Sequence, residues 1–116
     1  MKPEQIKSIS IAKDFSAYPA GRFLEDGEAS GTAFRDNLLI PALNGGFDKV
    51  EIIFDGVAGV GSSFLEEAFG GLIRKTGMSK IDLDQRLDLK TNEPDLEDFV
   101  RLARRYIEDA AKVTAT

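Results

Sequence analysis

The sequence predicts an α/β fold: a single domain over residues 1–116, with a mixed, mostly parallel four-stranded sheet packed against about three helices. Two observations predict it. Some segments alternate apolar and polar residues, as strands do, and others have apolar residues every three or four positions, as helices do. In the second half of the chain, the two kinds of segment follow one another in turn. Such an order favours parallel strands joined by helices. A chain of this length also buries a core without disulfides or metals.

Four segments have the pattern of strands. Asp48–Asp55 is the clearest, because Val50, Ile52 and Phe54 alternate with other residues and Ile53 adds apolar character to the second face. We therefore expect this segment to be central in the sheet. The other predicted strands are Gln5–Lys13, the short Arg22–Glu25, and Lys80–Lys90.

Three helices are expected from spacing and end signals, over residues 30–43, 62–77 and 95–110. Ser30 is a typical N-cap for the first, while Pro41 should kink or shorten its last turn. Gly77 is placed to end the second helix, and Pro94 lies near the start of the third, where a missing N–H costs little.

Composition excludes several classes of function. The chain has no Cys and no His, which removes disulfides, thiolate chemistry and the commonest general base and zinc ligand. Its net charge of -5 disfavours nucleic-acid binding. The first residues lack the apolar core of a signal peptide, and no stretch resembles a membrane span, so we expect a cytoplasmic protein without membrane contact.

The segment between Gly56 and Ser63 is the most distinctive loop of the sequence. Gly56, Gly59 and Gly61 are typical of a tight strand-to-helix turn that needs positive φ. They also permit a phosphate-binding interpretation, but the Lys of a P-loop is missing because Gly61 is followed directly by Ser62. For Ser63, the spacing to Glu66 predicts a structural capping box.

The charged residues around the second helix allow two interpretations. Arg22 and Arg35 are expected to form ion pairs with Glu66, Glu67 or Asp55. Alternatively, carboxylates are the ligands that Mg²⁺ prefers, and a magnesium site would use Asp26, Asp55, Glu66 and Glu67. Gly70 and Gly71 disfavour a helix, so we expect a close approach of another group to account for them.

The chain resembles the STAS-like domain family of unknown function. The resemblance is carried by Gly21-Arg22, Asp26-Gly27, Ser30-Gly31, Phe34-Arg35 and, above all, FDGVAGVGSSFLEEAFGGL from Phe54 to Leu72. It extends more distantly to STAS domains of the anti-sigma-factor antagonist type. The resemblance implies a partner of the histidine-kinase-like ATPase class that docks at this loop, and it places Ser62 on the phosphorylated position. Gly61 stands where those domains carry an Asp.

These observations lead to a functional hypothesis. We expect a non-catalytic regulatory domain that uses the loop Gly56–Ser63 and the exposed face of the following helix, with Glu66, Glu67 and Arg35, to bind a partner protein, and no cofactor. The alternative is a nucleotide- or Mg²⁺-binding domain that uses the same loop and the acidic residues. A homodimer through an exposed edge strand or helix face is a further possibility.

Overall fold

The computed structural model describes residues 3–114 and contains a parallel sheet. Its strands are arranged in the order β1-β2-β3. The α/β class and the central position of the Asp48–Asp55 strand are thus confirmed, but within residues 3–114 the sheet has three strands instead of four and all are parallel. The bounds are β1 (Ile6–Ser10), β2 (Lys49–Ile53) and β3 (Leu87–Lys90).

The predicted strand Arg22–Glu25 is wrong. The chain forms a 3₁₀ turn there, η2 (Leu24–Asp26), and Asp26 explains why. One Asp26 carboxylate oxygen accepts the backbone N–H groups of Arg22 at 3.0 Å and Phe23 at 2.9 Å. Aspartate side chains that bind nearby N–H groups compete with strand pairing, so the segment closes on itself.

The first half of the predicted strand Lys80–Lys90 is also wrong. It forms helix α5 (Lys80–Arg86), and only the residues after it form β3. Ser79 caps α5 by accepting the Asp82 N–H at 3.1 Å. Ile81, which fitted the alternating pattern, is 71% exposed. A short segment of apolar and charged residues satisfies both periodicities, and here the cap decides for the helix.

The three predicted helices are present, and the first two each contain a wider π turn in their middle. Gly77 ends the second helix in the left-handed conformation, with φ of 73°, and Pro94 opens a 3₁₀ turn before the third. The parts are α1 (Gly31–Phe34), η3 (Arg35–Leu39) and α2 (Ile40–Leu43); α3 (Ser62–Leu65), η4 (Glu66–Gly70) and α4 (Gly71–Thr76); and η5 (Pro94–Leu96) and α6 (Glu97–Thr114). A further π turn, η1 (Ile11–Phe15), follows β1.

Pro41 does not shorten the first helix, which continues to Leu43. A proline cannot donate to the carbonyl four residues earlier. The helix widens into η3 directly before Pro41, where the Ile40 N–H donates to the Arg35 carbonyl, five residues back. The wider turn accommodates the proline within a continuous helix.

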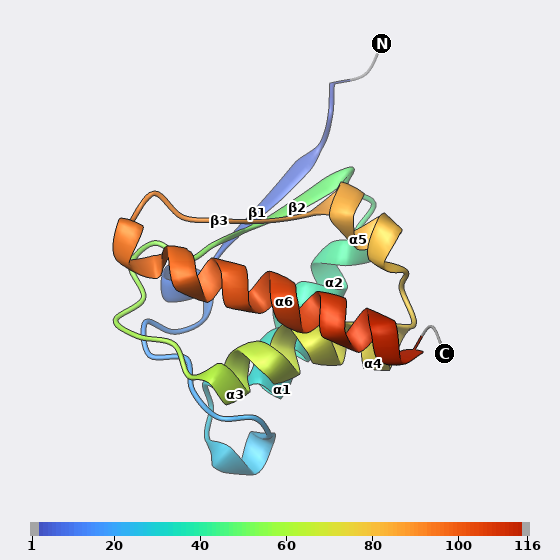
Figure 1. Ribbon diagram of the computed structural model, residues 1–116. Coiled ribbons are helices and arrows are strands. Elements are labelled where there is room, and N and C mark those ends of the chain that lie inside the picture. The colour runs from blue at the N-terminus through green and yellow to red at the C-terminus, as the bar shows by residue number, and fades with distance from the viewer. Residues whose placement is uncertain (1–2, 115–116) are drawn as a thin grey trace.

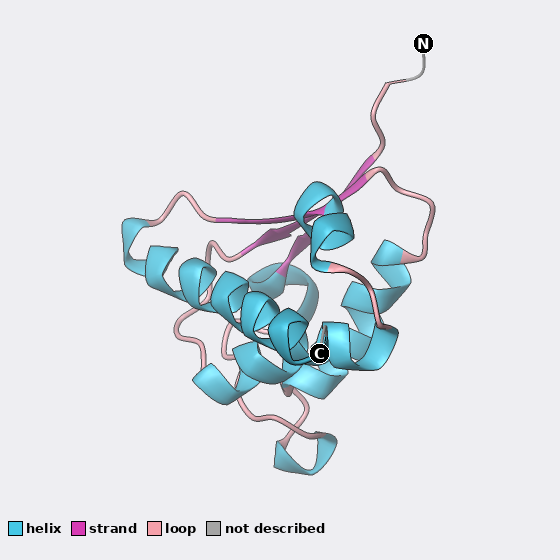
Figure 2. Ribbon diagram, turned by 45° about the vertical axis from the view of Figure 1, so that its right-hand side comes forward, coloured by secondary structure: helices cyan, strands magenta, loops and turns pink. Residues whose placement is uncertain are grey.

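The helices over residues 31–43, 62–76 and 97–114 lie on one face of the sheet (Figures 1 and 2). Strand side chains on that face are buried and pack on a cluster of phenylalanines, with ring centroids of Phe34 and Phe64 5.7 Å apart. On the other face, Glu51 accepts from Ser8 and from Lys90, each at 2.8 Å. That face is therefore polar. Within residues 3–114, no helix has the length and apolar character needed to cross a membrane.

Candidate functional site

The loop between β2 and α3 leaves the sheet at the carboxyl end of the central strand and is fastened on both sides. On one side, the Ala58 N–H donates to the Ala17 carbonyl at 2.7 Å and the Gly61 N–H to the Pro19 carbonyl at 3.3 Å. On the other, the Gly56 N–H donates to the Glu93 carboxylate at 2.7 Å. The loop is thus held in place from its backbone, while the Val57 side chain is buried in the core and Ala58 is exposed.

The structure places the predicted loop residues at or near the surface. Gly56 and Ser62 are exposed, while Gly59, Gly61 and Ser63 are half-buried. The expectation of positive φ holds for Gly56, with φ of 91°, and is wrong for Gly59 and Gly61. Only the first glycine is required by backbone conformation.

The second helix begins at Ser62, with Gly61 as its N-cap. The predicted capping box of Ser63 and Glu66 is therefore wrong: the Glu66 carboxylate binds Arg22 and Arg74 instead. Within the described chain, the N–H groups of Ser62 and Ser63 donate to no protein group, and neither hydroxyl forms a hydrogen bond. This helix start thus presents free donors and the positive end of the helix dipole to solvent.

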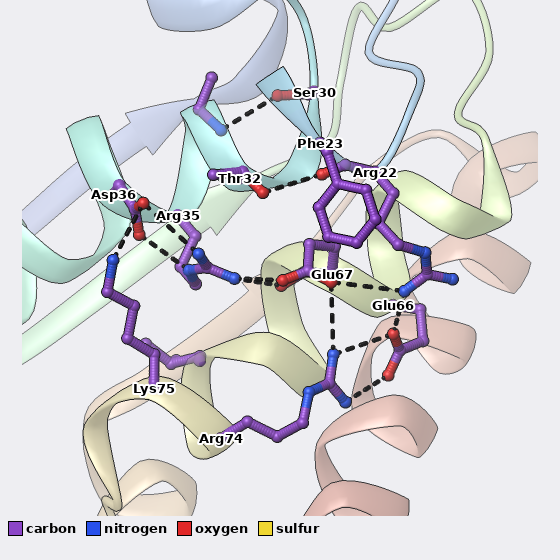
Figure 3. Close-up of polar contacts among 12 residues, drawn as sticks. Arg22, Phe23, Ser30, Thr32, Arg35, Asp36, Glu66, Glu67, Arg74 and Lys75 are labelled. Atoms are coloured by element: carbon purple, nitrogen blue, oxygen red, sulfur yellow. Dashed lines mark hydrogen bonds and ion pairs between the residues drawn. The ribbon is translucent and has the colours of Figure 1, made fainter. Parts of the chain in front are cut away.

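Seven charged residues form an ionic cluster beside this helix start, at the two π turns (Figure 3). At its centre, the Arg35 side chain is 8% exposed. Its Nε is 2.8 Å from Asp36 Oδ1 and its Nη1 is 2.5 Å from Glu67 Oε2. The expected pairing of Arg35 with Glu67 is confirmed. The members of the ionic cluster are Arg22, Arg35, Asp36, Glu66, Glu67, Arg74 and Lys75.

Two more arginines bind the carboxylates of η4 from outside. Arg74 holds Glu66 with two hydrogen bonds, 2.7 Å from Nη1 to Oε2 and 3.0 Å from Nη2 to Oε1. Arg22 also binds Glu66 and lies 3.4 Å from Glu67 Oε1. The expected pairing of Arg22 with Glu66 or Glu67 is confirmed as well. Two arginines bind Glu66, and three lie close to Glu67, because Arg74 Nη2 is 3.5 Å from Glu67 Oε1.

These contacts favour the charged forms of Glu66, Asp36 and Arg35. Hydrogen bonds from Arg74, and then from Arg22, lower the pKa of Glu66 although burial opposes them. A hydrogen bond from Arg35 lowers the pKa of Asp36 in the same way. For Arg35, burial pulls the pKa down, but the hydrogen bonds to Asp36 and Glu67 together raise it. Carboxylates whose pKa is held down are poorly suited to act as general acids near neutral pH.

The glycines of the second helix make room for this cluster, as expected from their unfavourable helix propensity. A Cβ on Gly71 would lie 2.6 Å from Arg35 Nη1, and one on Gly70 would lie 2.6 Å from Glu66 Oε2. Gly31 has the same role on the first helix, because a Cβ there would lie 2.6 Å from the Phe64 carbonyl oxygen. Glycines on both helices therefore permit the close contact across which Arg35 reaches Glu67.

The structure does not bring the four proposed magnesium ligands together. Asp55 accepts from the Thr91 hydroxyl at 2.6 Å and the Asn92 N–H at 3.0 Å. Asp26 binds its own turn, and the two glutamates bind arginines. Among residues 3–114, no three carboxylates are arranged to hold a metal ion.

Three members of the ionic cluster were not predicted from the sequence: Asp36, Arg74 and Lys75. Arg74 lies two helical turns after Glu66, which places both on one side of the helix. Asp36 and Lys75 lie on different helices, and only the fold joins them, at 3.1 Å between Lys75 Nζ and Asp36 Oδ2. Spacing within one helix could have revealed the first pair but not the second.

The second helix exposes only its two ends to solvent. Its middle is buried, including Ala68, Phe69 and Gly70, because the helix packs between α1 and α6. Its exposed residues are Ser62 at its start and Arg74, Lys75 and Thr76 at its end. An apolar hollow of about 690 Å³ lies elsewhere, between the start of α5 and the end of α6.

Comparison with known proteins identifies the family. Residues 30–97, from the start of the first helix to the start of α6, match the model of the STAS-like domain of unknown function. No curated protein and no solved structure matches the chain. The matched segment contains β2, the loop, the second helix and all but one member of the ionic cluster, Arg22. Because the match covers more than half of the chain, this protein belongs to the STAS-like domain family of unknown function.

Proposed function

We propose that this protein is a regulatory interaction domain without catalysis of its own, and that its partner binds the start of the second helix. The observation that carries the proposal is the exposed Ser62 on a helix start whose first N–H groups bind no other part of the described chain. Such a start favours an anionic group, either on a partner or added to the serine itself.

Exposed apolar side chains on the segment that binds the loop and Glu66 support a protein partner. Tyr18 is 74% exposed and lies between Ala17 and Pro19, whose carbonyls bind the loop. Phe23 and Leu24, which follow Arg22 at the start of η2, are 47% and 63% exposed. Exposed aromatic and apolar side chains around a polar centre are common in protein interfaces.

The ionic cluster removes an electrostatic obstacle to phosphorylation of Ser62. Glu66 and Glu67 lie one turn after Ser62 and, as free anions, would repel a phosphate. Both are bound by arginines, so their charge is compensated within the fold. We therefore propose Ser62 as the phosphorylated residue and a histidine-kinase-like ATPase as the partner, as the wider STAS resemblance implies.

The test uses the full chain, a candidate ATPase and ATP, with intact-mass spectrometry and size-exclusion chromatography. We expect the wild type and Ser63→Ala to gain one phosphoryl group and Ser62→Ala to gain none. Ser62→Asp should change the affinity for the ATPase. An unchanged mass, together with no complex for either wild type or Ser62→Asp, would contradict the proposal.

A further inference from the structure

A groove separates the outer edge of β1 from the first helix, away from the loop at Ser62. Its volume is about 450 Å³. On one side lie Ser8 and Ile9 of β1; on the other lie Leu38 and Pro41 of the helix, with Phe47 beyond it. None of these residues belongs to the loop or to the ionic cluster. The groove has the layout of a peptide site between an edge strand and a helix.

The backbone of β1 exposes hydrogen-bonding groups to this groove. The Gln5 carbonyl accepts the N–H groups of Asp48 and Lys49 at 2.8 and 3.2 Å, so Gln5 faces β2. Since neighbouring residues of a strand direct their backbone groups to opposite sides, Ile6 and Ser8 face outward. The Ser10 N–H faces outward too, and donates to the Asp14 carboxylate at 2.7 Å.

The two edges of the sheet differ in whether a side chain covers them. At β3, Arg104 of α6 donates to the Leu89 carbonyl at 3.1 Å and occupies the edge. At β1, the outward groups of Ile6 and Ser8 bind nothing in residues 3–114. Free edge groups are complemented best by another extended chain. The open edge at β1 therefore favours the binding of another extended chain.

Charge decides which strand can occupy it. Two charged residues line the groove: the Asp14 carboxylate accepts the Ser10 N–H, whereas Lys7 forms no ion pair within the described residues. If a second copy paired antiparallel through Ile6 and Ser8, the two Lys7 side chains would stand directly opposite each other, which is destabilising. Shifting the pairing to face Ser8 with Ser8 would bring Ile6 opposite Ser10, whose N–H is already bound. A second copy is thus disfavoured in both of these registers.

We propose that the β1 groove binds an extended peptide segment of a partner protein, with an acidic side chain opposite Lys7 and an apolar one two residues along. The backbone of the peptide pairs with Ile6 and Ser8. Its acidic side chain meets the cation of Lys7, and its apolar side chain packs on Leu38 and Phe47. The site does not include Ser62, so an experiment on the groove tests it separately from the function proposed above.

The test begins with selection of a phage-displayed random dodecapeptide library on the full chain, followed by fluorescence anisotropy with the enriched peptides. We expect peptides with an acidic and an apolar residue two positions apart. Ser8→Pro removes the outward N–H without touching the pairing with β2, and should weaken binding about tenfold. Ser8→Ala, which also loses the bond to Glu51, should bind as the wild type does. Lys7→Glu should weaken binding, and a peptide with Lys in place of its acid should restore it.

Hydrogen exchange of the wild type keeps the test decisive if Ser8→Pro does not fold. We expect the enriched peptide to slow exchange of the Ile6 and Ser8 amides. Failure to enrich any peptide, equal binding to Ser8→Pro and Ser8→Ala, or unchanged exchange at these amides would overturn the proposal. Slower exchange at higher protein concentration without peptide would assign the edge to a second copy and overturn it as well.

Discussion

The first and second helices start side by side, yet one start is closed and the other is open. At the closed start, the N–H groups of Gly31 and Thr32 donate to the carbonyls of Gly21 and Arg22 at 2.9 and 3.1 Å, and the Ser30 hydroxyl accepts from Ala33. At the open start, the corresponding groups of Ser62 and Ser63 find no partner in the described chain. The segment before the first helix thus completes one start and leaves the other for a ligand.

The difference indicates that the start of the first helix contributes to stability, whereas the start of the second is available for binding. The closed start is buried, with Ser30 fully inaccessible and Gly31 against the Phe64 carbonyl. The open start is exposed and has no side-chain cap. Changes at the closed start should therefore cost stability, whereas changes at the open start should leave the fold intact and alter binding.

The largest effect is expected at the ionic cluster that joins the two helices. Arg35→Met removes the buried cation and leaves Asp36 and Glu67 without their main partner, which should lower the free energy of unfolding by about 3 to 5 kcal/mol. Lys75→Met, at an exposed member of the same cluster, should cost less than about 1 kcal/mol. Urea unfolding of both variants measures the difference, and equal losses would show that the buried position of Arg35 is unimportant.

Glycine substitutions should separate the two starts directly. Gly31→Ala forces a Cβ against the backbone of the second helix, which cannot rotate away, and should cost about 3 kcal/mol, at the upper end for overpacking. Gly61→Ala meets only Ala20 atoms at 3.7 Å or more. It should cost less than about 1 kcal/mol. Thermal and urea unfolding compare the pair; a tolerated Gly31→Ala would mean that the helices are not held in close contact.

The serines that precede or begin the helices should differ in a smaller way. Ser30→Ala removes the cap of the closed start and should cost about 1 kcal/mol. Ser62→Ala removes a hydroxyl that binds nothing in the described chain and should change stability by less than about 0.5 kcal/mol. A Ser62→Ala variant as unstable as Ser30→Ala would indicate that Ser62 is structural.

The smallest effect is a pH dependence. Because the pKa of Glu66 is lower in the folded protein than in the unfolded chain, its contribution to stability is complete above about pH 4.3 and is lost as the pH falls through the folded value. Urea unfolding between about pH 6 and pH 3 should show this loss, and Glu66→Gln should flatten the curve at its acidic end. An identical slope in both proteins would mean that Glu66 does not couple to folding.

Sequence patterns predicted the elements with long, regular periodicity and strong end signals. The central strand, the three long helices, the Ser30 cap and the Gly77 stop are all of this kind. Arg22–Glu25 and Lys80–Arg86 were mistaken for strands because short segments fit two periodicities, and the bonds of Asp26 and Ser79 decided the outcome. Local hydrogen bonds outweigh pattern in segments of this length.

At the candidate site, residue types were predictable and geometry was not. Arg22 and Arg35 were expected to pair with Glu66, Glu67 or Asp55, and they pair with the two glutamates. Asp55 accepts hydrogen bonds from Thr91 and Asn92 instead. The wrong capping box at Ser63 placed the N-cap two residues too late, since the N-cap is Gly61 and the helix begins at Ser62. Only the fold shows that the free N–H groups belong to Ser62 and Ser63.

Amide hydrogen exchange, followed by NMR, compares the two helix starts most directly. We expect the amides of Ser62 and Ser63 to exchange at rates close to those of an unstructured chain, and those of Gly31 and Thr32 to be strongly protected. Equal protection at both starts would contradict the claim that the second helix presents an open, anion-accepting surface for a partner.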